Sequence, residues 1–366
     1  MDDFDRDVYC LAGLPFDAIS LPETVRHVRE AAMQSVPCFL STPNLNFLIA
    51  SQDDPDFRES VCQSDLSLAD GMPLVWMAKL LGLPICERVA GSDLFASLGE
   101  QVGSSGKKLS VFFFGGMEGV AARACEALNA QSSGFSCVGF EYPGIGAVAD
   151  MSSAETIERI NASGADFLVV ALGARKGQAW IMHNRQRINV PLISHLGAVV
   201  NFVAGTVSRA PRWMQRFGLE WLWRIKEEPA LWRRYWGDGL GFMGLLLMRI
   251  LPYGIWLRFN NARRSTGPKV EFSSGPLGLS INLSNALCSG RLDEVRIAFR
   301  RASSLSENVK LNLERVTYLD SAFLGLILML RKQVRAGGHA VQICNVPPGL
   351  RKVFYWCGAE YLLAKA

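Results

Sequence analysis

Short apolar runs alternate with segments of helical periodicity from Tyr9 to Val203, and most of the runs end in a polar or glycine-rich loop. Such runs predict buried strands at 9–13, 38–41, 66–69, 109–114, 137–142, 167–172 and in the stretch that ends at His195. Helical character is expected at 45–51, 72–81, 94–102 and 120–129, with Ser92 or Asp93 as the cap of the third helix. This alternation predicts an α/β domain with a mostly parallel, Rossmann-like sheet.

The segment 209–235 has a different period and is rich in tryptophan and arginine. Apolar residues recur every four positions, which predicts a helix with one apolar face formed by Trp213, Phe217, Trp221 and Ile225. This face can pack on the core as an ordinary amphipathic helix does. Alternatively, the segment binds a ligand through its guanidinium groups, which suit phosphate, at Arg224, Arg233 and Arg234.

The run 239–256, GLGFMGLLLMRILPYGIW, is apolar enough to raise the question of a membrane. A spanning helix needs about 20 mainly apolar residues, whereas this run contains Arg249, Pro252 and several glycines. Arginines flank both ends, at Arg233, Arg234, Arg258, Arg263 and Arg264. The pattern therefore favours an element that lies in the membrane interface, and a helix packed between domains is the alternative.

A smaller α/β pattern follows the linker ARRSTGP at 262–268. Strands are expected at 277–283, 309–313 and 340–344, and helices at 291–303, 321–336 and 349–356. We therefore divide the chain into a domain at 1–236, an apolar segment with a linker at 237–267, and a second domain at 268–366.

Composition agrees with a protein of at least two domains, because 366 residues with 49% hydrophobic content can bury a large core. A net charge of +4 is modest and does not indicate binding of nucleic acid. The nine cysteines lack a CxxC pair or metal-ligand spacing, so we expect mostly buried or reduced thiols and no bound metal or other cofactor. The acidic start MDDFDRDVYC does not resemble a secretory signal, which favours a cytoplasmic protein.

Candidate chemistry lies where the predicted strands end. Thr42 and Asn44 follow the strand at 38–41, Asp70 follows the strand at 66–69, and Arg88 lies in the next loop. The carboxyl edge of a parallel sheet is where ligands bind, so a base, a cation and two hydrogen-bonding groups are expected to meet there. Asp70 also precedes a glycine, and Asp-Gly is a common turn, but its position between strand and helix favours catalysis.

Glycines mark further exits from strands, at Gly115, Gly116 and Gly173, where backbone amides can approach a diphosphate. The GGxxG run is not a complete dinucleotide fingerprint, which disfavours an oxidoreductase. Asp54-Pro55-Asp56 has the form of a metal-binding DxD triplet, but a helix cap before Pro55 is the favoured interpretation. His195 also lies at a strand end, where it could contact a phosphate or a sugar, but a lone histidine there is more often structural, and we do not assign it as the base.

Several ordered motifs carry a resemblance to a known family: TPN, ADG after a strand, ERVAGSDL, FFFGG, GADFLVVALG and RAPRWMQRFGLEWLWRIKEEPALWRRY. Over about residues 8–236 the chain resembles the WecG/TagA/CpsF glycosyltransferases, glycosyltransferase family 26. The resemblance implies inverting, metal-independent transfer of an N-acetylhexosamine-type sugar from a UDP-sugar to a polyprenyl-diphosphate-linked saccharide, for a bacterial exopolysaccharide or cell-surface polysaccharide. It also implies a C-terminal appendage that closes the site and touches the cytoplasmic face of the membrane.

Within this resemblance Asp70 is the expected base, and Thr42 and Asn44 position sugar hydroxyls. Transfer without a metal requires other cations at the leaving group, which favours a diphosphate-binding role for Arg88 and for the later arginines Arg224, Arg233 and Arg234.

One motif departs from the family, whose usual pattern is close to G-x-P-K-Q-E-x-W. Alignment on Trp180 places Gly177 where the family has glutamine, and Gln178 where it has glutamate. Gln178 or Arg175 is then the substitute for the missing contact with the sugar. A changed donor sugar and a catalytically inactive, sugar-nucleotide-binding scaffold are the two explanations.

The motif VTYLDSAFLGL at 316–326 resembles the signature of STAS domains, whose length and element order residues 268–366 match. Asp320 is expected to cap the following helix, and Ser321 aligns with the serine that some STAS proteins phosphorylate. Ala322-Phe323 replaces the usual small pair, so binding or scaffolding is favoured over phosphoregulation. Removal of 268–366 is expected to spare catalysis on a soluble acceptor but to alter regulation or localisation. A partner for this domain and a homo-oligomer stay open.

Overall fold

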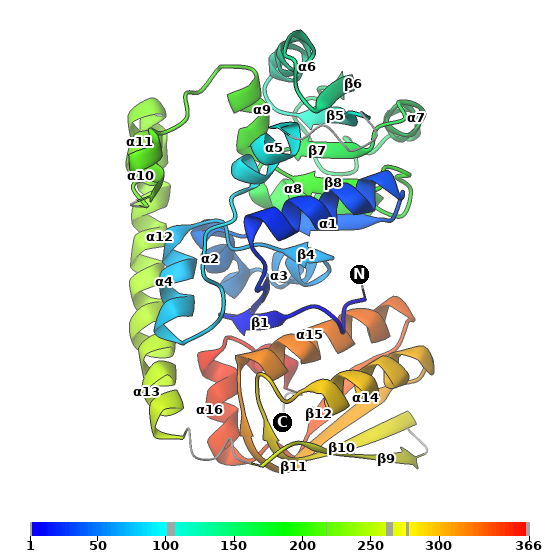
Figure 1. Cartoon of the computed structure of the whole chain (residues 1–366), viewed down its shortest axis with the longest axis vertical. Coiled ribbons are helices and arrows are strands. Elements are labelled where there is room, and N and C mark those ends of the chain that lie inside the picture. Colours follow the sequence, from blue (N-terminus) through cyan, green and yellow to red (C-terminus); the bar gives the residue numbers. More distant parts are fainter. Residues whose placement is uncertain (1, 101–106, 217, 261–265, 276–277, 364–366) are drawn as a thin grey trace.

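The fold was analysed in a computed structural model, which describes residues 2–100, 107–216, 218–260, 266–275 and 278–363. Figure 1 shows a large α/β domain at one end, a small α/β domain at the other, and a long helix that runs along one side of both. The N-terminal segment lies between the two domains.

The large domain contains a six-stranded sheet of order β4-β3-β8-β7-β5-β6, in which every neighbouring pair is parallel. This confirms the predicted fold class. The strands are β3 (Cys38–Ser41), β4 (Leu66–Ser67), β5 (Leu109–Gly115), β6 (Phe135–Glu141), β7 (Phe167–Ala171) and β8 (Leu192–His195).

Two apolar layers cover this sheet. One face packs against side chains from α1 (Leu21–Met33), α5 (Gly91–Glu100), α6 (Val120–Ala130) and α9 (Gly197–Val203). The other face packs against α7 (Ala154–Ala162) and α8 (Ala174–Asn184), where Trp180 is fully buried. The helices α2 (Leu45–Asp53), α3 (Pro55–Cys62) and α4 (Met72–Leu80) follow the first two strands. Burial on both faces explains why the strands read as continuous apolar runs.

Three local predictions need correction. Helix α5 begins at Gly91, so Ser92 and Asp93 lie in its first turn and do not cap it, while Val102 lies outside the described residues. Cys125 and Cys137 form a disulfide, and the other seven cysteines are free, as expected. The expected first strand does not join the main sheet, because β1 (Val8–Leu11) pairs only with β2 (Leu14–Asp17) as a hairpin.

The small domain has a sheet of order β12-β11-β10-β9. Its elements are β9 (Lys269–Gly275), β10 (Gly278–Leu287), α14 (Asp293–Ser304), β11 (Val309–Leu319), α15 (Ser321–Ala336), β12 (Val341–Cys344), α16 (Pro348–Trp356) and the 3-10 turn η4 (Glu360–Leu362). Asp320 caps α15 by accepting hydrogen bonds from the amides of Ala322 and Phe323, as predicted. The sequence pattern did not reveal β9, which pairs antiparallel with β10.

The two domains share one continuous apolar core. It contains the buried β1 hairpin, parts of α2, α3 and α4, and most of the apolar interior of the small domain. The contact is close at the backbone, since a Cβ atom added to Gly325 of α15 would lie 2.1 Å from the carbonyl oxygen of Val8. The turn of the β1 hairpin also contacts the backbone at the end of α16, where the Gly13 amide donates a hydrogen bond to the Cys357 carbonyl at 2.6 Å.

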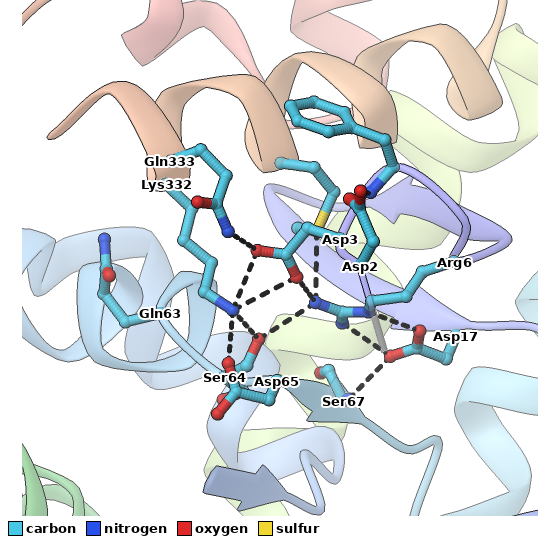
Figure 2. Close-up of polar contacts among 12 residues, drawn as sticks. Asp2, Asp3, Arg6, Asp17, Gln63, Ser64, Asp65, Ser67, Lys332 and Gln333 are labelled. Atoms are coloured by element: carbon cyan, nitrogen blue, oxygen red, sulfur yellow. Dashed lines mark hydrogen bonds and ion pairs between the residues drawn. The ribbon is translucent and has the colours of Figure 1, made fainter. Parts of the chain in front are cut away.

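A buried cluster of charges crosses this junction (Figure 2). Arg6 binds both carboxylate oxygens of Asp17, at 2.9 and 2.8 Å, and donates to Asp3 at 2.6 Å. Lys332 of α15 donates to Asp3 at 3.1 Å and to Asp65, just before β4, at 2.6 Å. Burial alone would raise the pKa of Asp3, but Lys332 and Arg6 outweigh burial and hold this pKa below its ordinary value. The cluster therefore fixes the small domain to the first strands of the sheet.

The long helix continues across the expected boundary at residue 236. It comprises the 3-10 turn η1 (Pro229–Leu231), α12 (Trp232–Leu245), a π-helical turn η2 (Leu246–Ile250) and α13 (Leu251–Phe259). Asn46 of α2 donates to Asp238 of α12 at 3.1 Å, and Arg249 pairs with Glu360 of the small domain at 2.7 Å. One side of this helix is thus attached to both domains.

Candidate active site

Three loops meet at the carboxyl edge of the sheet, beside β3 and β4. The amide of Asp70 donates to the carbonyl of Pro43 at 2.9 Å, and the amide of Val89 donates to the carbonyl of Ala69 at 3.0 Å. A Cβ atom on Gly91 would lie 3.3 Å from Oγ1 of Thr42, which places Thr42 against the third loop. Asn44 caps α2 by accepting from the Phe47 amide at 3.2 Å. The structure therefore brings together Thr42, Asn44 and Asp70, as the strand ends predicted.

Asp70 lies among these loops and is partly buried. Burial is the largest influence, and it raises the pKa of Asp70 to about 7. The guanidinium of Arg88 opposes this rise, whereas the carboxylates of Glu220 and Asp93 add to it. A carboxyl group with a pKa near neutrality can accept a proton from a substrate and release it again at physiological pH.

Arg88 is near enough to Asp70 to influence its pKa, and two other carboxylates bind its guanidinium. It donates to Glu220 at 2.6 Å and to Asp93 at 2.9 Å, while Arg209 also pairs with Asp93. Glu220 belongs to α11 (Glu220–Glu227) of the appendage. Sequence reasoning missed Glu220, Asp93 and Arg209 as parts of the site, although Asp93 lies in the motif ERVAGSDL and the other two lie in the motif that begins RAPRWMQRFGLE. A diphosphate that binds Arg88 has to share it with these carboxylates or displace them.

Gly115, the last residue of β5, and Gly116 allow the chain to turn at the end of this strand. Gly115 and Gly116 have φ values of 99° and 85°, which glycine tolerates best. The amide of Gly116 donates to the Ala171 carbonyl at 2.7 Å. This amide is therefore not available to a diphosphate, and that expectation is corrected for Gly116. Gly173 differs, because it precedes the first turn of α8 and a Cβ atom there would meet no other atom within 4 Å.

Gln178 does not face the crevice. Its side chain is fully buried and donates from Nε2 to Oγ of Ser41 at 3.0 Å. This burial disfavours Gln178 as the substitute for the family's sugar-binding glutamine, although its Oε1 has no hydrogen-bond partner among the described residues. Arg175 pairs with Asp54 at 3.3 Å, near the start of α3.

The appendage packs beside the site without placing its three predicted arginines on Asp70. Arg224 lies over the ring of Phe202 on α9, 5.5 Å from its centroid, whereas Arg233 and Arg234 are exposed on α12. No hydrogen bond or ion pair among the described residues joins Arg233 or Arg234 to the Asp70 loop. The apolar face predicted for this segment is interrupted between α10 (Arg212–Arg216) and α11. Phe217 lies outside the described residues, and Trp213 and Trp221 are exposed. These two tryptophans are therefore not core residues.

The DxD triplet acts as a helix cap. Asp54 accepts a hydrogen bond from the Phe57 amide at 3.0 Å at the start of α3, which is the role favoured from the sequence. Among the residues that the structure describes, no three His, Cys, Asp or Glu side chains form a group that could hold a metal ion.

Ser321 lies inside the junction between the domains. It is fully buried, its hydroxyl donates to the Cys10 carbonyl at 2.8 Å, and its amide donates to the hydroxyl of Tyr253 at 3.0 Å. A kinase cannot reach this hydroxyl without separating α15 from β1 and α13. The placement argues against the predicted regulatory role of Ser321.

Known proteins resemble the chain in both parts. The model of the family "Glycosyl transferase WecG/TagA/CpsF family" matches residues 9–253, and that of the STAS domain matches residues 268–363. An N-acetylglucosaminyldiphosphoundecaprenol N-acetyl-beta-D-mannosaminyltransferase of Bacillus spizizenii is 32% identical over 222 residues, which cover 60% of this chain and 84% of the relative. A protein of the same name from Bacillus subtilis is 29% identical over 203 residues, 55% of this chain and 76% of the relative.

Among solved structures, the phosphorylated form of the Bacillus cell fate determinant SpoIIAA is 22% identical to the matched part, covering 27% of this chain and 91% of that protein with a TM-score of 0.23. The family model extends over more than half of the chain, and the bacillar relatives align with most of their own length. The chain therefore belongs to the WecG/TagA/CpsF family of glycosyltransferases and carries a STAS domain at its C-terminal end.

Proposed function

We propose that this protein transfers an N-acetylhexosamine from a UDP-sugar to a polyprenyl-diphosphate-linked saccharide, with inversion and without a metal ion. The single observation that carries the proposal is the carboxyl group of Asp70 near Arg88, at the carboxyl edge of the sheet. Both Bacillus relatives are named for a diphosphoundecaprenol-linked acceptor and for an N-acetylmannosaminyl group. These names support the proposed classes of acceptor and transferred sugar.

In the proposed reaction the acceptor hydroxyl oxygen attacks the anomeric carbon from the face opposite the UDP. Asp70 takes the hydroxyl proton as the new carbon–oxygen bond forms, and the bond between the anomeric carbon and the phosphate oxygen breaks. The electron pair leaves with UDP, whose growing negative charge Arg88 stabilises. Thr42, beside the Gly91 loop, and the amide nitrogen of Asn44, which has no hydrogen-bond partner among the described residues, hold sugar hydroxyls, while the exposed turn at Gly173 borders the diphosphate.

The test is UDP release by the purified full-length protein in the presence of EDTA. UDP-N-acetylmannosamine and UDP-N-acetylglucosamine are each supplied with undecaprenyl-diphosphate-linked N-acetylglucosamine or without it. Release that requires the acceptor and persists in EDTA is expected. Binding of a UDP-sugar without any release would instead support the alternative, a catalytically inactive scaffold, and release that EDTA abolishes would exclude metal independence.

A second part of the proposal concerns the membrane. Helix 229–259 is the one helix among the described residues that is long and apolar enough to cross a bilayer. Its outward side carries an apolar stripe at helical spacing, formed by Trp232, Trp236, Leu240, Met243, Leu247, Ile255 and Phe259. Trp236 is 68% exposed and Phe259 is 85% exposed, and exposed arginines stand beside the stripe at Arg233, Arg234 and Arg258.

The opposite side of the same helix supports a position on the membrane rather than through it. Asp238, Leu245, Ile250, Tyr253 and Leu257 are buried against the two domains. A spanning helix would have to lose these contacts and the hydrogen bond from Asn46 to Asp238. We therefore place the apolar stripe in the interface of the cytoplasmic membrane, with the arginines near anionic lipid headgroups. This arrangement makes the protein cytoplasmic and peripherally attached.

Replacement of both Trp236 and Leu240 with glutamate is expected to weaken binding to vesicles of phosphatidylglycerol about 100-fold, because about 3 kcal/mol of apolar transfer is lost. Co-sedimentation with the vesicles measures the change. Ile297→Glu is the matched control, since Ile297 is 64% exposed but lies on α14 of the STAS domain. Equal loss in both proteins, or no loss in either, would rule out the apolar stripe as the attachment site.

A further inference from the structure

His195 lies at the carboxyl edge of the six-stranded sheet, at the end of one of its inner strands. It is the last residue of β8, which lies between β3, the strand before Thr42, and β7, the strand before Gly173. Only 8% of the residue is exposed, and its ring lies 6.0 Å from the ring of Phe47, centroid to centroid. The imidazole is therefore held at the edge of the sheet where the proposed donor binds.

The ring also explains the departure at Gly177. A Cβ atom on Gly177 would lie 2.2 Å from Cδ2 of His195, far inside any real contact distance. No side chain other than hydrogen fits at position 177 while the imidazole holds its place. The ring of His195 thus occupies the position that the Cβ atom of any other residue at 177 would need.

The hydrogen bonds of the ring fix which nitrogen can meet a ligand. Nε2 is bound to the carbonyl oxygen of Leu172, and because a carbonyl only accepts, Nε2 must carry the hydrogen. Burial lowers the pKa of His195, with a partial opposing effect from the Leu172 carbonyl, so the ring is neutral near pH 7. Nδ1 therefore has a free lone pair.

Nδ1 is the ring atom that remains available. The Cδ2 edge faces α8, and Nε2 faces Leu172. No hydrogen bond to Nδ1 is present among the described residues, so this nitrogen can accept one from a ligand. A neutral nitrogen that only accepts can bind a hydroxyl or an amide N–H. It cannot bind an ionised phosphate, which has no hydrogen to donate.

We infer that Nδ1 of His195 accepts a hydrogen bond from a hydroxyl or the acetamido N–H of the donor sugar, at the carboxyl edge of the sheet, where the lack of a side chain at Gly177 makes room for the imidazole. This inference rests on the proposed function and adds to it a specificity-determining residue. His195 recognises the sugar and not the UDP moiety. It follows that changes at this residue alter the preference for a UDP-sugar over UDP itself.

Two near-isosteric variants separate the nitrogens. The amide nitrogen of glutamine in His195→Gln can replace Nε2 as donor to Leu172 but leaves no acceptor at the position of Nδ1. The amide oxygen of asparagine in His195→Asn reaches the position of Nδ1 and can still accept. The affinities of the full-length proteins for UDP, UDP-N-acetylmannosamine and UDP-N-acetylglucosamine are measured by calorimetry, which needs no turnover.

The His195→Gln variant is expected to bind the preferred UDP-sugar about 3- to 10-fold more weakly than the wild type, with UDP affinity unchanged. His195→Asn should remain close to the wild type. Gly177→Ala, which forces the ring out of place, should show the same selective loss as the glutamine variant. Unchanged sugar preference in both His195→Gln and Gly177→Ala, or a wild type that binds neither sugar more tightly than UDP, would overturn the inference. A wild type that does not bind UDP at all would overturn the proposed function itself.

Discussion

Replacement of Asp70 with asparagine is expected to lower kcat for sugar transfer about 10²- to 10⁴-fold, because an amide cannot take the proton of the acceptor hydroxyl. KM for the UDP-sugar should change little, since Asp70 acts on the acceptor. The measurement is UDP release under saturating donor and acceptor. Asn has nearly the same shape as Asp, so the loops joined through the Pro43 carbonyl and the Asp70 amide are retained.

The pH dependence provides an independent signature of the same residue. Only ionised Asp70 can act as a base, and its pKa is raised to about 7. We therefore expect kcat/KM of the wild type to increase as pH rises toward 7 and to level off above it. The residual activity of the Asp70→Asn variant should lack this limb. A wild-type profile that is flat between pH 5 and about 8 would remove Asp70 from the role of base.

Stability measurements show whether the Asp70→Asn variant is folded. Burial raises the pKa of Asp70 in the folded state above its ordinary value of 3.8, so the folded protein binds this proton more tightly than the unfolded chain. Its contribution to stability is therefore largest at low pH and declines as the pH rises from 3.8 to about 7. Asparagine carries no charge, so the Tm of the variant at pH 8 should equal or exceed that of the wild type. A lower Tm would attribute the loss of activity to misfolding.

Removal of the STAS domain, residues 268–366, is expected to prevent stable folding of the remainder. The sequence alone led to the opposite expectation, that catalysis survives this truncation. In the structure the β1 hairpin and the inner side of α13 are buried against the STAS domain. Truncation would expose this apolar surface and remove Lys332 from Asp3 and Asp65. Aggregation, or loss of a cooperative thermal transition, is the expected result. A soluble and active 1–267 fragment would refute the shared core.

A single methyl group tests the same junction more gently. In Gly325→Ala the new Cβ would lie 2.1 Å from the Val8 carbonyl oxygen, which neither backbone can avoid without moving. We expect a loss of about 2–3 kcal/mol in the free energy of unfolding, measured in urea. The control is Gly349→Ala in α16, where a Cβ atom would meet nothing within 4 Å and the effect should be near zero.

Local patterns in the sequence determined most of the elements. The strand 38–41 and the helix 321–336 have the predicted bounds, because the apolar pattern defines each one. Asn44 caps α2, which follows this strand, and Asp320 caps the helix 321–336. The edge strand β9, KVEFSSG, alternates between polar and apolar residues only over its first four positions, and it escaped prediction. Strand ends also placed Thr42, Asn44 and Asp70 at one edge, since parallel strands bring their carboxyl ends together.

The rest of the site depends on contacts between residues far apart in the chain. No local pattern shows that Glu220 binds Arg88, that Gln178 points to Ser41, or that the ring of His195 excludes a side chain at Gly177. Likewise, the STAS signature appeared to mark a separable domain, whereas Arg6, through Met329, and Lys332 and Ser321 join it to the catalytic domain.

The sequence by itself thus determined the family, the α/β class, the STAS domain and the position of the candidate base, because these follow from periodicity and from motifs within short segments. Tertiary structure alone decided which side of helix 229–259 faces solvent, which carboxylates surround Arg88, and whether the two domains are independent. The physical reason is that burial and electrostatic environment depend on what packs against a side chain, and those neighbours come from distant parts of the chain.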